Sequence, residues 1–267
     1  MQRIIMTAEN SVAKALRSVG ERIQAASMQR TSTIPSVEPR LVAVSKTKPV
    51  SMILEAYQTG QRNFGENYVQ ELVDKSHDAT IREQCTDIRW HYIGHLQSNK
   101  VKKLLSSPNL YMVETVDSRK LASELEKHWS KETDRGTLRV FVQVNTSGEA
   151  NKSGVSPEDC SGVVRHLFDN CSSLEFAGLM TIGSFDHSLD NGPNPDFQCL
   201  IRCREEVCKE CSLDIDKVEL SMGMSHDFEH AISVGSTNVR VGSTIFGARE
   251  KAKSKSEPPV KNKDEPA

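Results

Sequence analysis

A lysine directly follows an apolar run early in the chain, where its amine could do covalent chemistry. The run is Leu41-Val-Ala-Val-Ser, and Lys46 comes next. Partial removal from water favours the neutral amine, which attacks a carbonyl carbon to form a Schiff base. Lys48 would lie on the same side of an extended strand, but Pro49 indicates that Lys48 is already in the connecting loop. The pattern favours Lys46 over Lys48, although a single lysine at a strand end is more often a solvated surface residue.

Two segments near the end of the chain combine glycine with serine, a composition that suits phosphate binding. They are Ser221-Met-Gly-Met-Ser225 and Arg240-Val-Gly-Ser-Thr244. Glycine lets backbone N–H groups approach an anion, and a helix that starts near Asp227 would direct its positive end at the same place. The hydroxyls of Ser225 and Ser243 add donors. Either segment alone is also typical of an ordinary turn, but the pair predicts a phosphate site.

Short apolar runs alternate with helical patterns along most of the chain. Eight runs have the length of strands: 41–46, 62–66, 90–93, 110–116, 138–145, 174–182, 217–221 and 239–244. The helical patterns between them include 51–59, 118–129, 156–169 and 227–234. This alternation predicts a parallel sheet, and eight strands favour a closed barrel over an open doubly wound sheet of about five or six strands. The predicted fold class is therefore α/β, with a single parallel (β/α)8 barrel, or TIM barrel.

The two ends of the chain lie outside this alternation. An amphipathic helix is predicted for about residues 7–29, with an apolar stripe formed by Val12, Leu16, Val19 and Ile23. A mitochondrial presequence is the alternative for this segment, because its acidic residues are few. We expect residues 1–247 to form the barrel domain. Residues 248–267 are rich in Lys, Glu, Ser and Pro, so we expect a disordered charged tail.

Charge and hydropathy exclude several classes of partner. The chain has 34 basic and 36 acidic residues and a formal net charge of -2. Such a balance offers no basic field to hold a nucleic acid or a membrane surface. No run approaches the roughly 20 apolar residues of a membrane-spanning helix. The sequence therefore predicts neither a nucleic-acid partner nor a membrane partner, and leaves small molecules open.

Four of the seven cysteines lie close together, which raises the question of a metal site. They are Cys199, Cys203, Cys208 and Cys211. Structural zinc usually takes two close pairs from separate turns, whereas the helix predicted over 197–211 points these two pairs in different directions. We expect no metal there. An odd number of scattered cysteines predicts free thiols in a reducing compartment, taken as the cytoplasm, with the mitochondrion as the alternative.

Several long motifs, in order along the chain, resemble the pyridoxal phosphate homeostasis protein family. They are Ala43-Val-Ser-Lys-Thr-Lys-Pro49, Phe64-Gly-Glu-Asn-Tyr-Val-Gln-Glu71, Trp90-His-Tyr-Ile-Gly-His-Leu-Gln-Ser-Asn99, Gly178-Leu-Met-Thr-Ile-Gly183, Leu220-Ser-Met-Gly-Met-Ser225 and Arg240-Val-Gly-Ser-Thr-Ile-Phe-Gly247. The resemblance spans residues 41–249. It implies a barrel like the N-terminal domain of alanine racemases, with pyridoxal 5′-phosphate as the cofactor.

The resemblance also implies roles for particular residues. Lys46 would be the Schiff-base lysine, and Arg240 would be the partner of the pyridine nitrogen. The phosphate would be held by Ser225, Gly242 and Ser243. Asn67 would lie near the ring. We also expect four titratable residues near the cavity mouth and assign none of them a catalytic role: Glu66, Tyr68, His91 and His95.

Three functions remain open at this point. The family resemblance implies a binding protein that keeps the cofactor as an imine and exchanges it with pyridoxal phosphate-dependent apoenzymes. Such a protein would contribute to vitamin B6 homeostasis without turnover, and we expect it to be a monomer.

A pyridoxal phosphate-dependent amino acid racemase is the alternative. Arg240 counts against it, because a guanidinium keeps its proton and leaves the ring a weaker electron sink. The sequence after the eighth strand also leaves no room for the second domain of a racemase. The third function is a barrel that binds a sugar phosphate without a cofactor and uses Lys46 as an aldolase does.

Overall fold

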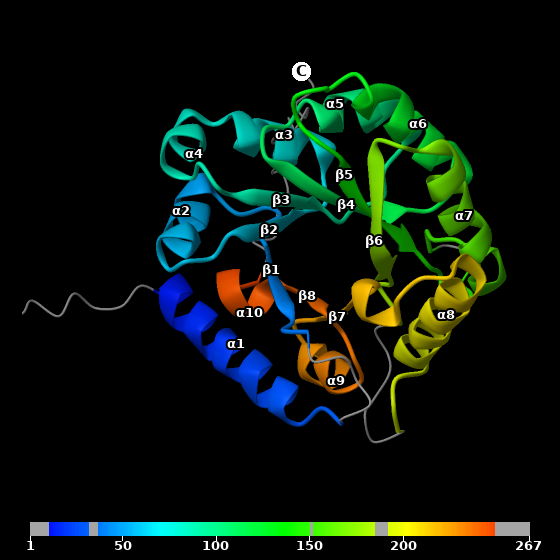
Figure 1. The fold of residues 1–267 in the computed structure, drawn as a ribbon. Helices are drawn as coiled ribbons and strands as arrows, with labels where there is room; N and C mark the ends of the chain where they lie inside the picture. Colours follow the sequence, from blue (N-terminus) through cyan, green and yellow to red (C-terminus); the bar gives the residue numbers. More distant parts are fainter. Residues whose placement is uncertain (1–10, 32–36, 150–151, 185–191, 249–267) are drawn as a thin grey trace, which may run out of the picture.

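Eight parallel strands form a closed barrel in chain order, surrounded by helices (Figure 1). The computed structural model describes residues 11–31, 37–149, 152–184 and 192–248. The strands are β1 (Arg40–Val44), β2 (Asn63–Glu66), β3 (Arg89–Tyr92), β4 (Leu110–Val116), β5 (Leu138–Gln143), β6 (Leu174–Met180), β7 (Glu219–Met224) and β8 (Asn238–Val241). The barrel closes where β1 pairs with β8, with Val42 opposite Arg240. The predicted (β/α)8 barrel is confirmed.

The helices lie around the outside of the barrel; α1 precedes the first strand, and the others follow strands in sequence. They are α1 (Ser11–Met28), α2 (Val50–Gln58), α3 (Val69–His77), α4 (Ala79–Gln84), α5 (Val101–Leu105), α6 (Arg119–Trp129), α7 (Cys160–Asn170), α8 (Pro195–Cys211), α9 (Phe228–Ser233) and α10 (Ser243–Phe246). Capping residues explain two of the helix starts: the Ser118 hydroxyl accepts a hydrogen bond from Leu121 N, and Asn194 precedes Pro195 at the first turn of α8.

The N-terminal helix packs against α2, α9 and α10 through the predicted stripe (Figure 1). Val12, Leu16, Val19 and Ile23 are all buried in the core. Arg22 of α1 makes a bidentate ion pair with Glu229 of α9, with N–O distances of 2.8 and 2.7 Å. The helix is confirmed from Ser11 onward. Its expected first turn, at residues 7–10, and the expected tail at 249–267 lie outside the described residues.

Alternate residues of each strand face the barrel interior and the helices. On β3, Trp90 and Tyr92 are buried in the core between barrel and helices, while His91 points inward and contacts Glu114 of β4. The expectation that His91 lies near the cavity mouth is therefore wrong. The period of two on β3 places its ring within the barrel, where it is fully buried. A second interior cluster consists of Met112, Phe141, Ala177 and Met180.

Several predicted strands end at other residues than expected, and two of these differences lie at the cavity. The run 239–244 stops at Val241, and Ser243 begins α10 instead, because Gly242 leaves the strand with φ −120° and ψ −72°. The run 217–221 extends to Met224. The register between β7 and β8 shifts between Ser221 and Met224, where Gly223 has φ 94°. This left-handed conformation favours glycine.

The cysteines are free thiols, as predicted, and all seven lie in the described ranges. Cys199 and Cys203 lie on α8, and burial raises the pKa of Cys203 to about 12, so that this thiol stays protonated. Within the described ranges no group of three or more His, Cys, Asp or Glu side chains is arranged to hold a metal ion. No helix in those ranges has both the length and the apolar character needed to cross a membrane.

Candidate functional site

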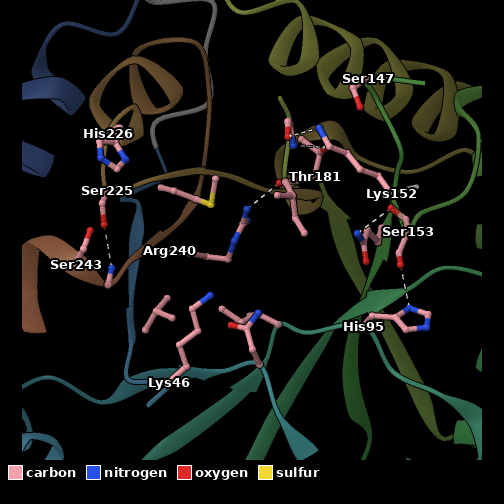
Figure 2. Close-up of a pocket in the computed structure, with 18 of the residues that line it drawn as sticks. Lys46, His95, Ser147, Lys152, Ser153, Thr181, Ser225, His226, Arg240 and Ser243 are labelled. Atoms are coloured by element: carbon pink, nitrogen blue, oxygen red, sulfur yellow. Dashed lines mark hydrogen bonds between the residues drawn. The ribbon is translucent and has the colours of Figure 1, made fainter. Parts of the chain in front are cut away.

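A cavity of about 720 Å³ lies at the carboxyl ends of the strands, where the active sites of such barrels are found (Figure 2). Six residues singled out from the sequence line this one cavity: Lys46, Asn67, Ser225, Arg240, Gly242 and Ser243. They come from the ends of β1, β2, β7 and β8, so segments far apart in the chain meet here.

Lys46 is carried by the turn that follows β1. Val42 and Val44 are buried next to Gly65 inside the barrel, and Lys46 continues the same alternation one step above them. In Figure 2 its amine points toward the middle of the cavity, below Arg240. Lys48 also lines the cavity, but its amine donates to the Ala248 carbonyl at 2.8 Å. Lys46 therefore stays the predicted reactive amine.

Two serines and a glycine form one wall of the cavity. The Ser225 hydroxyl accepts a hydrogen bond from Gly242 N at 3.1 Å, which leaves its own O–H free to donate to a ligand. Ser243 begins the single turn of α10, whose first amide groups have no partner within the helix. An added Cβ on Gly242 would lie 3.2 Å from both the carbonyl oxygen and the Cβ of Val44. Glycine therefore lets β8 and β1 approach each other closely beneath this wall.

Arg240 rises from β8 in the centre of the barrel, and only 4% of the residue is exposed. Its two terminal nitrogens donate to the Ser221 hydroxyl at 2.6 Å and to the Thr181 carbonyl at 2.7 Å. Burial lowers the pKa of the guanidinium, while the charge of Glu114 raises it. An arginine so held keeps its charge and a fixed orientation, and can donate hydrogen bonds but cannot accept them.

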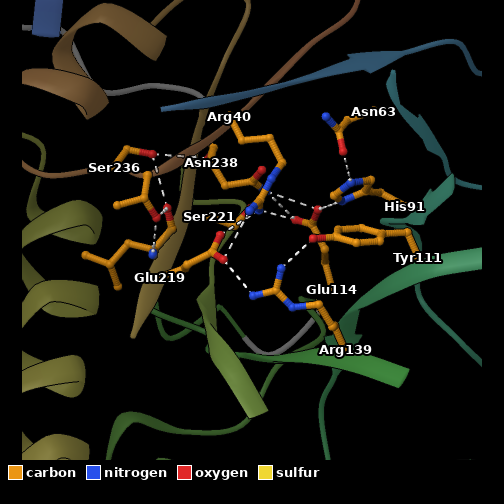
Figure 3. A network of polar contacts seen from close by, with 12 residues as sticks. Arg40, Asn63, His91, Tyr111, Glu114, Arg139, Glu219, Ser221, Ser236 and Asn238 are labelled. Atoms are coloured by element: carbon orange, nitrogen blue, oxygen red, sulfur yellow. Dashed lines mark hydrogen bonds and ion pairs between the residues drawn. The ribbon is translucent and has the colours of Figure 1, made fainter. Parts of the chain in front are cut away.

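Glu114 is the anion at the centre of a polar network inside the barrel (Figure 3). Its carboxylate accepts hydrogen bonds from Ser221 Oγ at 2.6 Å and from Asn238 Nδ2 at 3.1 Å, and lies 2.7 Å from His91 Nδ1. Burial disfavours its charge, but the contact with His91, the charge of Arg240 and the Ser221 hydroxyl outweigh burial and lower the pKa of Glu114. Burial lowers the pKa of His91. Glu114 therefore balances the buried charge of Arg240.

Asn67 follows β2 and is fixed by close backbone packing. An added Cβ on Gly94 would lie only 2.0 Å from the Asn67 carbonyl oxygen, and the Gly94 carbonyl accepts a hydrogen bond from Thr115 at 2.7 Å. The Asn67 side-chain oxygen is buried without a partner among the described residues. The same is true of Gln143 Oε1, whose amide orientation is fixed because Nε2 donates to the Ser153 carbonyl at 3.0 Å. A ligand with hydrogen-bond donors would satisfy such oxygens.

The charge of the cavity wall suits an anion. The described lining residues include Lys46, Lys48, Lys152 and Arg240, and none of them is Asp or Glu. Lys152 lies across the cavity from Ser225 and Ser243 in Figure 2 and is ion-paired with Glu149 at 2.6 Å, so the positive charge of the wall comes mainly from the other three. Excess positive charge in a concave site attracts anionic ligands.

The titratable residues expected at the mouth have different positions. His95 lines the cavity and contacts Ser153 Oγ at 3.0 Å. Tyr68 is 52% exposed and is not among the lining residues. Glu66 is fully buried beside Lys75, also outside the lining. Burial raises the pKa of Glu66, partly offset by the charge of Lys75. His95 is the one of these residues that can reach a ligand.

Sequence reasoning missed Glu114 and its contacts. The signal was available, because a single carboxylate interrupts the apolar run 110–116, and a buried charge needs a partner. The partners themselves lie 107 residues away at Ser221 and 124 residues away at Asn238, so only the closed barrel reveals them.

The cavity residues fit a ligand that combines an aldehyde, a phosphate and a heteroaromatic ring. The Lys46 amine can bond to an aldehyde, the Ser225 and Ser243 hydroxyls can donate to a phosphate, and Arg240 can donate to a ring nitrogen. The unpartnered buried oxygen of Asn67 indicates room for a further donor from the ligand.

Comparisons with known proteins give relatives at high identity, although no family model matches the sequence. The human pyridoxal phosphate homeostasis protein is 55% identical over 248 residues, which cover 93% of this chain and 90% of the human one. PipY of Synechococcus elongatus PCC7942, solved with PLP bound, has a TM-score of 0.72 at 29% identity and covers 88% of this chain and 100% of its own. Alanine racemase from Corynebacterium glutamicum has a TM-score of 0.61 at 16% identity, covers 92% of this chain and 63% of its own, and shows only the shared fold.

Proposed function

This chain belongs to the pyridoxal phosphate homeostasis protein family, and on that premise we propose that it binds pyridoxal 5′-phosphate as a Schiff base on Lys46 and contributes to vitamin B6 homeostasis. One observation carries the proposal: a lysine amine, two serine hydroxyls and a buried arginine line the same cavity. When bound, the cofactor supplies an aldehyde that combines with a primary amine and a ring that withdraws electrons.

Each residue has a part in holding the cofactor. Lys46 would form the covalent link, and Ser225, Gly242 and Ser243 would hold the phosphate. Arg240 would donate to the pyridine nitrogen, and Asn67 would lie near the ring. Because a guanidinium keeps its proton, Arg240 would leave the ring nitrogen unprotonated and the ring a weaker electron sink. This arrangement favours retention of the cofactor over amino acid chemistry.

The proposed role is that of a carrier without catalytic turnover. Its partners are pyridoxal phosphate-dependent apoenzymes, which receive the cofactor, and the protein acts as a monomer. The seven free thiols support a reducing compartment such as the cytoplasm.

A transfer assay tests the carrier role. The loaded protein is mixed with the apo form of a pyridoxal phosphate-dependent enzyme, and the return of that enzyme's activity is followed. We expect faster reactivation than in a mixture with Lys46→Ala and the same total cofactor. Equal rates in the two mixtures would contradict the carrier role.

The racemase alternative has its own test. The loaded protein is incubated with each of a set of amino acids in deuterated water, and incorporation of deuterium at the α-carbon is measured. We expect no incorporation beyond that caused by free pyridoxal phosphate. Exchange at enzymatic rates with any amino acid would replace the carrier with an enzyme.

A further inference from the structure

The turn that carries Lys46 rests on a buried ion cluster outside the cavity. The cluster consists of Lys75 and Glu71 on α3 and Glu66 at the end of β2. The Lys75 amine donates to Glu66 Oε1 and Glu71 Oε1, both at 2.7 Å, and to the Ser45 carbonyl at 2.8 Å. Its side chain is only 8% exposed, so the cluster is largely shielded from water. None of these three residues is among the described residues that line the cavity.

The cluster holds the residues on both sides of Lys46. On one side, the Ser45 carbonyl accepts from Lys75, and the Ser45 hydroxyl donates to Glu66 Oε1 at 2.7 Å. On the other side, the Thr47 N–H donates to Glu71 Oε1 at 2.6 Å. A single carboxylate oxygen of Glu71 thus joins Lys75 to the Thr47 peptide group. The peptide groups next to Lys46 are fixed from outside the cavity.

The backbone of this turn needs such support. Thr47 has φ 62°, in the left-handed region that a β-branched side chain disfavours. Strained conformations of this kind persist only where surrounding contacts hold them, and they occur often at functional sites. The hydrogen bond from Thr47 N to Glu71 is one such contact, and the bond from Lys48 N to the Ser45 carbonyl at 3.0 Å, which closes the turn, is another.

We propose that Lys75, Glu66 and Glu71 are positioning residues that fix the Ser45–Thr47 turn and so present the Lys46 amine to the cavity. The Lys75 side chain lies between the two carboxylates, with its amine 2.7 Å from an oxygen of each. The proposal rests on the proposed function for the identity of the ligand, but the order of the turn itself does not depend on it.

The first test uses the protein without cofactor. Hydrogen exchange, followed by mass spectrometry of the peptide containing Lys46 and Thr47, is compared between the wild type and Glu71→Ala. We expect protection at Thr47 to be lost in the variant and kept in Glu83→Ala, which removes an exposed carboxylate from α4. Unchanged protection in Glu71→Ala would overturn the proposal even if the protein never binds pyridoxal phosphate.

The second test measures affinity and includes a rescue. Glu71→Ala should weaken the binding of pyridoxal 5′-phosphate about tenfold, because only a fraction of the molecules then hold the turn in the competent form. Adding Thr47→Gly to this variant should recover most of the loss, because glycine adopts the left-handed conformation without help. A lost affinity that Thr47→Gly leaves unchanged, in a variant with the wild-type melting temperature, would also overturn the proposal.

Lys75→Met provides a second route to the same result. It removes the ammonium and keeps most of the side-chain volume, and should reduce protection on both sides of Lys46. If this variant does not fold, Glu71→Ala alone decides the matter. A wild-type protein that forms no imine with pyridoxal phosphate would refute the proposed function and leave the hydrogen-exchange test of the turn intact.

Discussion

Lys46 and Lys48 have the same side chain and line the same cavity, but their amines lie in different surroundings. The Lys48 amine donates to the Ala248 carbonyl, and Figure 2 shows the Lys46 amine pointing toward the middle of the cavity, below Arg240. Sequence alternation could not separate the two, and Pro49 gave the only hint. The two lysines are separated by a turn at Thr47. The backbone of Thr47 is left-handed, which no sequence pattern predicted.

The two lysines can be distinguished by matched substitutions. Lys46→Ala should abolish the imine absorbance with pyridoxal phosphate while the far-ultraviolet circular dichroism stays that of the wild type. Lys48→Ala should keep the imine band, because its amine bonds to a carbonyl at the rim. An imine band in Lys46→Ala that Lys48→Ala lacks would reverse the assignment.

A second prediction concerns the charge of Glu114. Glu114→Gln leaves the Arg240 guanidinium buried without its anion, which should reduce the free energy of unfolding by about 3–5 kcal/mol. Glu83→Gln, an exposed change on α4, should leave stability unchanged. Urea denaturation of the two variants and the wild type measures this. Equal midpoints for all three would contradict the role of Glu114 as the counter-ion.

Among the elements, the eight strands and the N-terminal helix could be predicted because apolar spacing reports which face of each element is buried. The strand ends could not, because they depend on pairing. β7 continues past Ser221 through a register shift against β8, and β8 stops where Gly242 turns into α10. The cavity wall could be predicted because Ser225 and Ser243 follow neighbouring strands. The interior network could not, because it joins strands that are far apart in sequence.

Two glycines should respond in opposite ways to alanine. In Gly94→Ala the new Cβ would meet the Asn67 carbonyl oxygen at 2.0 Å, and backbone must move. We expect a loss of about 3 kcal/mol in the free energy of unfolding, together with weaker cofactor binding through Asn67. Gly20 lies exposed within α1 with no atom near its missing Cβ, so Gly20→Ala should stabilise by about 0.5–1 kcal/mol. Thermal and urea unfolding measure the change in the free energy of unfolding of each variant. Equal changes in the two variants would contradict the close packing of Gly94 on Asn67.

In the molecule as a whole, two separate polar networks support residues that line the cavity. The interior network around Glu114 holds Arg240 from beneath, and the cluster around Lys75 holds the Lys46 turn from outside. Glu114, Glu66 and Lys75 are all buried, so removing the partner of any one of them should be costly.

Acid should weaken the molecule through this interior network. The pKa of Glu114 is held below its ordinary value of 4.5, so its contribution to stability is complete above pH 4.5 and is lost as the pH falls through the lowered pKa. The difference in unfolding free energy between the wild type and Glu114→Gln should therefore shrink below pH 4.5. Urea denaturation across pH 3 to 7 measures it, and a difference independent of pH would mean that Glu114 is not ionised in the folded protein.

The absorption spectrum of the protein with pyridoxal 5′-phosphate, before and after borohydride, should be measured first, followed by peptide mapping of the reduced product. We predict an imine band beyond the protein absorbance that borohydride abolishes, with the reduced cofactor found on Lys46. No band at any cofactor concentration, or a label confined to Lys48 or Lys152, would contradict the binding of the cofactor through Lys46.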